Sequence, residues 1–131
     1  VEKVKVIKWM VKHFFLTKEV IENLRENFTY YTIQKYVFNM FLTKELTENA
    51  FKIYCLLFDR AKVSAMNNYC GENGSIYVYY TYEQFKETMD IKNTAIVSAL
   101  NLLEEKALIK REKGFNSSKI YLAYVEDGSI D

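Results

Sequence analysis

The chain has 131 residues, of which 50% are hydrophobic and 27% are charged, and its formal net charge is +1. This length predicts one domain with one core, and the hydrophobic content excludes an intrinsically disordered chain. The near balance of charge excludes a general attraction to nucleic acid, so a DNA-binding surface would have to come from local segregation of charge.

The residue types favour no enzyme, and we expect no catalytic residue, cofactor or metal. The only histidine, His13, has no metal-ligand partner at a suitable spacing, and the phosphate-binding glycine motifs do not occur. Cys55 and Cys70 lie fifteen positions apart and form no zinc or redox motif. Reduced cysteines and a cytoplasmic location are therefore expected.

The start of the chain predicts neither export nor a membrane partner. No apolar run approaches the roughly twenty residues that cross a bilayer. The opening VEKVK is charged and lacks a signal-peptide pattern. The first residue is Val1 and not Met, which indicates a fragment or a trimmed chain.

Residues 1–28 predict an N-terminal extension with a basic start and a short helix. Thr17 is placed to cap a helix that begins at Lys18 and ends at about Asn27. FLTKEVIENL in this extension recurs as FLTKELTENA at 41–50, with seven of ten positions identical. Because a solenoid needs at least three units, we interpret the recurrence as reuse of a helix start, with partial duplication of an anchoring segment as the alternative.

The next segment predicts the longest helix and then a strand. Apolar residues recur at helical spacing after Thr47, in the set Leu46, Ala50, Ile53, Leu57 and Ala61. Roughly twenty helical residues would span about 30 Å and cross the domain. CGENG ends this helix, and the alternation in SIYVYY at 75–80 predicts a short strand with Val78 on its buried face.

Two short helices and a hairpin follow. Thr81 is placed to cap YEQFKETM, in which Phe85 and Met89 would face inward. Ile91 fills the turn, and Asn93 is placed to cap the second helix. The buried stripe of that helix is predicted to be Ile96, Ala99, Leu100 and Leu103. LIKREK, the turn GFNSS and KIYLAYV predict the hairpin.

This order of elements predicts a mainly α (α+β) winged helix-turn-helix with a small three-stranded antiparallel sheet. The strand at 75–80 would pair with the hairpin, because three strands are more stable than two. The predicted organisation is an extension at 1–28, the winged helix at 29–125, and an acidic tail or linker start at 126–131.

The stretch GENGSIYVYYTYEQFKETMDIKNTAIVSALNLLEEKALI resembles the N-terminal winged-helix domain of RepA-type replication initiators of Gram-positive plasmids. The likeness covers about residues 29–125 and includes YYTIQKYVFN, an extended approach containing Ile33 and Lys35, and LTENAFKIYCLLFDRA. The resemblance implies sequence-specific binding of double-stranded origin repeats by a homodimer. It also implies a separate C-terminal domain, missing here, that recruits the replication machinery.

The resemblance further implies which residues contact DNA. The base-reading residues would be Lys92, Asn93, Thr94, Val97, Ser98 and Asn101. The hairpin would supply backbone contacts through its basic residues, Lys110, Arg111, Lys113 and Lys119. Phe115 at its tip could wedge into a minor groove, contact a partner or fold back under the hairpin. Since Asn suits adenine and Val suits the thymine methyl, these residue types favour an A·T-rich site.

Alternative functions stay open on the sequence. A transcription regulator that binds an operator has the same motif, and a winged helix can serve protein assembly without DNA. A homodimer would use the segment before Thr43, whose aromatic residues include Trp9, Phe14, Phe15, Tyr30 and Tyr31, with packing of these residues on their own domain as the alternative. The chain has eleven tyrosines. We expect most of them in the core, which disfavours stacking on single strands.

Overall fold

The computed structural model describes residues 16–23, 30–71, 74–113, 118–123 and 125. The chain divides into two compact units, residues 1–31 and 32–131. In the first unit, helix α1 (Lys18–Asn23) begins directly after Thr17, where a helix was predicted. Its predicted continuation to Asn27 and the basic start lie outside the described residues.

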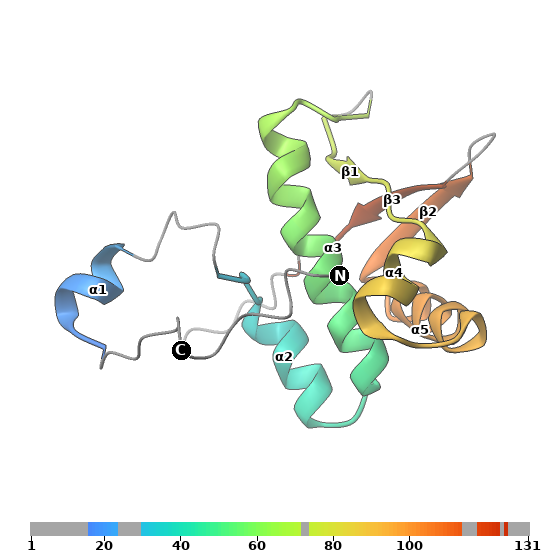
Figure 1. Ribbon diagram of the computed structural model, residues 1–131, viewed down its shortest axis with the longest axis horizontal. Helices are drawn as coiled ribbons and strands as arrows, with labels where there is room; N and C mark the ends of the chain where they lie inside the picture. Colours follow the sequence, from blue (N-terminus) through green and yellow to red (C-terminus); the bar gives the residue numbers. More distant parts are fainter. Residues whose placement is uncertain (1–15, 24–29, 72–73, 114–117, 124, 126–131) are drawn as a thin grey trace. The chain divides into compact units, whose positions relative to one another are not determined.

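The second unit is a winged helix-turn-helix (Figure 1). Its elements are α2 (Lys35–Leu42), α3 (Glu48–Met66), β1 (Tyr77–Val78), α4 (Tyr82–Met89), α5 (Asn93–Glu105), β2 (Ile109–Lys113) and β3 (Ser118–Leu122). The strands form one antiparallel sheet in the order β1-β3-β2. The predicted fold class is therefore confirmed.

Helix α3 is the central element, and α2, α5, β1 and β3 pack against it. The Thr47 side chain caps it by accepting from the Ala50 amide at 3.2 Å, and Ile53 and Leu57 are fully buried. The Tyr54 hydroxyl donates to the Ala123 carbonyl at 3.0 Å, and burial raises the pKa of Tyr54 to about 12. With 19 residues, α3 confirms the predicted long helix.

The extended approach expected at Ile33 and Lys35 is wrong in part, because Lys35 begins helix α2. Val37 and Met40 lie three positions apart and are both buried, so this short helix is held by packing against α3. Gln34, the N-cap of α2, links the start of this helix to Val125, far along the chain. Gln34 donates to the Val125 carbonyl and accepts from the Val125 amide.

Strand β1 is shorter than the predicted strand at 75–80. Only Tyr77 and Val78 pair with β3, opposite Tyr121 and Ile120, while Ile76 forms an isolated bridge with Cys70. The chain then leaves the sheet to approach α4, where the ring of Tyr80 stacks on that of Phe85 with centroids 4.2 Å apart. This stacking competes with continued strand pairing.

Helices α4 and α5 form the helix-turn-helix. The Thr81 hydroxyl accepts from the Gln84 amide at 3.1 Å, and Gln84 Oε1 accepts from the Thr81 amide at 2.8 Å. This capping box confirms the predicted start of α4. Asp90, with φ of 55°, ends the helix in the left-handed region.

The predicted cap of α5 is wrong. Lys92 occupies the N-cap with extended backbone and no side-chain capping bond, and Asn93 is the first helical residue. The helix is fixed instead by its buried stripe, since Ile96 and Leu100 are almost fully buried. The Asn93 side chain is exposed.

The expectation that most tyrosines lie in the core is also wrong. Of the ten tyrosines that the structure describes, only Tyr54 is buried. Six are exposed: Tyr30, Tyr31, Tyr36, Tyr69, Tyr79 and Tyr82. The alternation along a strand explains part of this result, because a sheet covered on one face turns every second side chain away from the core.

Candidate nucleic-acid interface

Helix α5 has a buried face and an exposed face without charge. Its buried residues pack on the core formed with α3 and α4. The exposed residues before the last turn are Asn93, Thr94, Val97, Ser98 and Asn101, and Glu105 is exposed at the C-terminal end of the helix. Lys92 is exposed at the N-cap just before them. The structure therefore brings together all six residues that were predicted to read bases.

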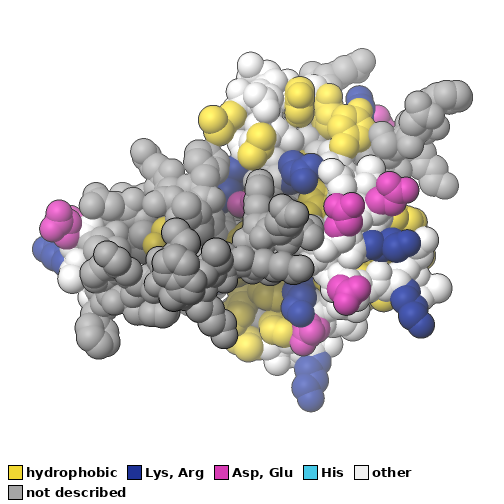
Figure 2. Space-filling model, viewed as in Figure 1, with side chains coloured by type: hydrophobic (Ala, Val, Ile, Leu, Met, Phe, Trp, Pro, Cys, Tyr) yellow, Lys and Arg dark blue, Asp and Glu magenta, His cyan; other side chains and the backbone are white. Residues whose placement is uncertain are grey.

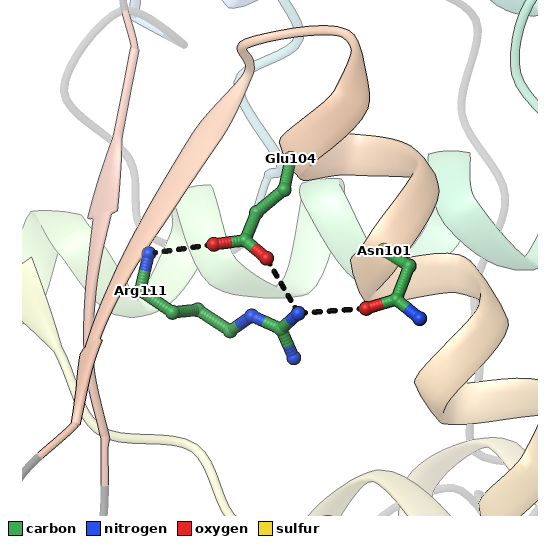
Figure 3. Close-up of polar contacts among 3 residues, drawn as sticks. All are labelled: Asn101, Glu104 and Arg111. Atoms are coloured by element: carbon green, nitrogen blue, oxygen red, sulfur yellow. Dashed lines mark hydrogen bonds and ion pairs between the residues drawn. The ribbon is translucent and has the colours of Figure 1, made fainter.

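Strand β2 connects to this face through Arg111 (Figure 3). Nη2 of Arg111 donates to Asn101 Oδ1 at 2.8 Å and to Glu104 Oε1 at 2.5 Å. The Arg111 amide also donates to Glu104 Oε2, at 3.1 Å. Because a guanidinium can only donate, the Asn101 oxygen must face Arg111, and this contact fixes the orientation of the Asn101 amide group.

Glu104 is not a free surface charge, because it is paired with Arg111. The hydrogen bond from the Arg111 side chain holds the pKa of Glu104 below its ordinary value. Arg111 is half-buried, and its register partner Ile120 lies in the core. Arg111 thus projects from the face of the sheet that packs on the helices, and its charge is already paired.

The signal for this contact was present in the sequence. Asn101 and Glu104 are three positions apart, so they lie on the same side of a helix. Arg111 is two positions from Ile109 on a strand, so both side chains lie on the face that packs on the helices. From the sequence, Asn101 and Arg111 were predicted to contact DNA separately, and their contact with each other was not predicted.

Lys110 and Lys119 lie on the opposite, outer face of the sheet. Lys110 pairs in register with Tyr121, and Lys119 pairs with Glu112. Both lysines line a groove of about 580 Å³ on this outer face. The structure does not bring them together with the exposed residues of α5. The side chain of Lys113 and all of Phe115 lie outside the described residues.

The comparison with known families decides the identity of the fold. Residues 29–129 match the family "Replication initiator protein A (RepA) N-terminus". The chain belongs to this family. The resemblance seen in the sequence is therefore confirmed, and the match covers the whole winged helix of this RepA-family domain.

Solved structures agree with the family. The chain is 28% identical to the protein in "Structure of Rep-DNA complex", with a TM-score of 0.62 over 88% of each chain. It is also 28% identical to that in "Structure of MDR initiator", with a TM-score of 0.60 over 85% of this chain and 86% of the other. A third, "N-Terminal domain of DNA binding protein", gives 28% identity and a TM-score of 0.59 over 88% of each. No curated protein matches the chain.

The charge of this RepA-family domain is mixed over its helix-turn-helix. On the face drawn in Figure 2, basic and acidic side chains of the described residues alternate over α4 and α5, without a continuous basic band. Among the described residues, no three His, Cys, Asp or Glu side chains are grouped to hold a metal ion. Nor does the described part of the chain contain a helix long and apolar enough to cross a bilayer.

Proposed function

We propose that this RepA-family domain binds double-stranded DNA at a replication origin, with α5 in the major groove. The observation that carries the proposal is the exposed, uncharged face of α5, which is fixed to the core by a fully packed stripe. A groove about 12 Å wide accepts a helix, and short polar side chains can approach base edges there. The similarity to a protein in a Rep–DNA complex supports the same use.

Affinity for DNA and discrimination between base sequences would come from different parts of this interface. Lys92 stands at the N-cap of α5, where the free amides of the first turn also favour a phosphate. Thr94 and Ser98 can donate to or accept from a base, and Val97 suits a thymine methyl. This division accounts for a reading helix without arginine, because phosphate contacts position a protein and base contacts specify its site.

Arg111 acts in this proposal as a positioning residue for Asn101. The contact at 2.8 Å leaves the Asn101 NH₂ group and a second lone pair of Oδ1 for DNA. Those two groups match N7 and N6 of adenine. Holding the side chain in one orientation before binding reduces the entropy lost in the complex.

The composition of the exposed face favours DNA over a protein partner. Val97, which is 36% exposed, is the only large hydrophobic side chain exposed on α5. The core of a protein interface is usually more apolar than this. The assembly role that the sequence left open is therefore the weaker candidate for this helix.

Self-association belongs to the same proposal and would use the surface around α2. Large apolar side chains are exposed there, in the set Ile33, Tyr36, Phe38 and Leu42. Their number exceeds the scattered exposure of an ordinary surface. A homodimer would also match the two-fold symmetry that repeated DNA sites often have.

The proposal also covers contacts with the replication machinery and the location of the protein in the cell. Contacts with the replication machinery are assigned to a C-terminal domain, as the resemblance implies. A cytoplasmic location fits the two cysteines, which are both free, Cys70 being exposed and Cys55 half-buried.

Selection of bound duplexes from a random pool tests the proposed function. We expect enrichment of an A·T-rich site by the wild-type chain and none by Ser98→Glu, which places a negative charge on the reading face. Ala65→Glu adds the same charge at an exposed position of α3 and should enrich the same site as the wild type. Failure of the wild type to enrich any duplex would overturn the proposal.

A further inference from the structure

Four tyrosines, two exposed and two half-buried, gather on the outer face of the sheet. Tyr77 lies at the centre, with the ring centroids of Tyr69, Tyr79 and Tyr121 at 6.3, 5.5 and 5.9 Å. Figure 2 shows hydrophobic side chains collected over the end of α3 and over β1. Aromatic rings at such a surface offer planar apolar faces that the core does not use.

The groove of about 580 Å³ adjoins this cluster and adds charge to it. Two lysines, Lys110 and Lys119, line it together with one acid, Glu112, and the ring of Tyr121. Lys119 Nζ lies over the ring of Tyr77, 4.7 Å from its centroid, so a cation is held against the aromatic cluster.

Gly71 makes room for the position of Tyr121. A Cβ atom at residue 71 would lie 2.9 Å from the Tyr121 hydroxyl, which is closer than real side chains approach. The absence of a side chain at this position lets the tyrosine ring lie along the groove. The groove therefore depends on a close approach between the loop before β1 and strand β3.

We propose that this outer face binds single-stranded DNA and holds an unpaired base in the groove. The base would stack on Tyr121, which any base can do through its planar face. Lys110 and Lys119 would contact the neighbouring phosphates, and the Glu112 carboxylate would accept a hydrogen bond from a base amino group. Duplex DNA does not fit this site, because its bases are already stacked and paired.

The chemistry of the groove favours a nucleic acid over a protein. Lysine and glutamate are depleted at the centre of protein interfaces, whereas basic side chains interleaved with aromatic rings are typical of surfaces that bind single strands. The site is independent of the proposed duplex site, because neighbouring strand residues Lys110 and Arg111 project from opposite faces of the sheet. With this site, the domain would bind single-stranded DNA in addition to duplex DNA.

Binding of a fluorescent oligodeoxycytidylate by the full chain tests the inference. We expect Tyr121→Leu to weaken this binding by roughly five- to a hundredfold, since that is the usual effect of losing one stacking ring. Lys119→Met should lower the dependence on salt by about 0.7 of a unit of slope. Tyr82→Leu, at an exposed tyrosine of α4, is the matched control and should bind as the wild type does.

The test separates this site from the duplex site. Ser98→Glu should still bind the single strand, and Tyr121→Leu should still bind a selected duplex, which also shows that the variant is folded. Photocrosslinking of an oligonucleotide with one 5-iododeoxyuridine should give adducts on tyrosines of the outer face. The inference is overturned if the wild type binds duplex but not the single strand, if Lys119→Met and Tyr121→Leu both bind the single strand normally, or if the adducts lie on α5.

Discussion

The guanidinium of Arg111 donates a hydrogen bond to Asn101 across 2.8 Å, from strand β2 to the exposed face of α5. The same nitrogen donates to Glu104, so the arginine charge is paired within the domain. A paired arginine contributes little to the attraction of phosphates. Its position beside a candidate reading residue instead indicates that it orients that residue.

Replacement of Arg111 distinguishes a contact with DNA phosphates from a role in orienting Asn101. Arg111→Met should weaken binding to the preferred duplex by roughly 1 kcal/mol, because Asn101 loses its fixed orientation. Binding to a scrambled duplex and the dependence on salt should stay unchanged. Fluorescence anisotropy titrations of both duplexes over a series of salt concentrations measure all three quantities.

Lys92→Met is the control for a phosphate contact. Lys92 is exposed at the N-cap of α5, and its loss should weaken all duplexes alike and reduce the salt slope by about one unit. If Arg111→Met gives the same pattern as Lys92→Met, then Arg111 contacts phosphate and its positioning role is wrong.

The contact between Arg111 and Glu104 predicts a pH dependence of stability. The hydrogen bond from Arg111 lowers the pKa of Glu104 in the folded state. Such a carboxylate contributes stability that is present above the unfolded pKa and is lost as the pH falls through the folded pKa. Glu104→Gln should therefore be less stable than the wild type at neutral pH, and the difference should shrink on acidification. Urea unfolding at several pH values measures it, and a difference that is constant with pH would contradict the prediction.

The capping box of α4 should stabilise the helix-turn-helix measurably. Thr81→Ala removes the hydroxyl that accepts from the Gln84 amide and should lower the free energy of unfolding by about 1 kcal/mol. Thr88→Ala, at an exposed position inside the same helix, should cause no loss, since alanine has the higher helix propensity. Urea denaturation of both variants tests this, and equal losses would exclude a contribution from the cap.

The proposed dimer predicts a response to charge on α2. Leu42, which is 60% exposed, ends this helix, and Leu42→Lys should shift the chain towards the monomer in sedimentation at micromolar concentration. Removal of residues 1–28 should also give a folded monomer. Met66→Lys changes a residue that is 67% exposed at the end of α3 and should leave the dimer intact. A wild-type chain that sediments as a stable monomer rules out the dimer.

Sequence patterns predicted the fold well where a helix carries a regular stripe of apolar residues or a capping side chain at its start. The stripe of α3 and the Thr81 cap are local signals, because the spacing of apolar residues and the side chain before a helix act within one or two turns. Helix α2 was missed because its helical signal is only eight residues long, and tertiary packing of Val37 and Met40 holds it.

The candidate site was predictable in part. The exposed face of α5 agrees with helical periodicity, while the six residues predicted to read bases were named from the resemblance to the RepA family. The pairing of Arg111 with Asn101 depends on the packing of β2 against α5. The outer-face cluster around Tyr77 depends on strand register, which joins residues far apart in the chain. Periodicity within one segment carries no information on that register.

The central claim is that the uncharged face of α5 discriminates between duplex sequences. The most direct measurement is the dissociation constant of Asn101→Ala and of the wild type for a selected duplex and for a scrambled one, over a series of salt concentrations. The account predicts that Asn101→Ala loses roughly 1–3 kcal/mol on the selected duplex only, with the scrambled duplex and the salt slope unchanged. Equal losses on both duplexes, or a wild-type chain that binds no duplex at low salt, would contradict it.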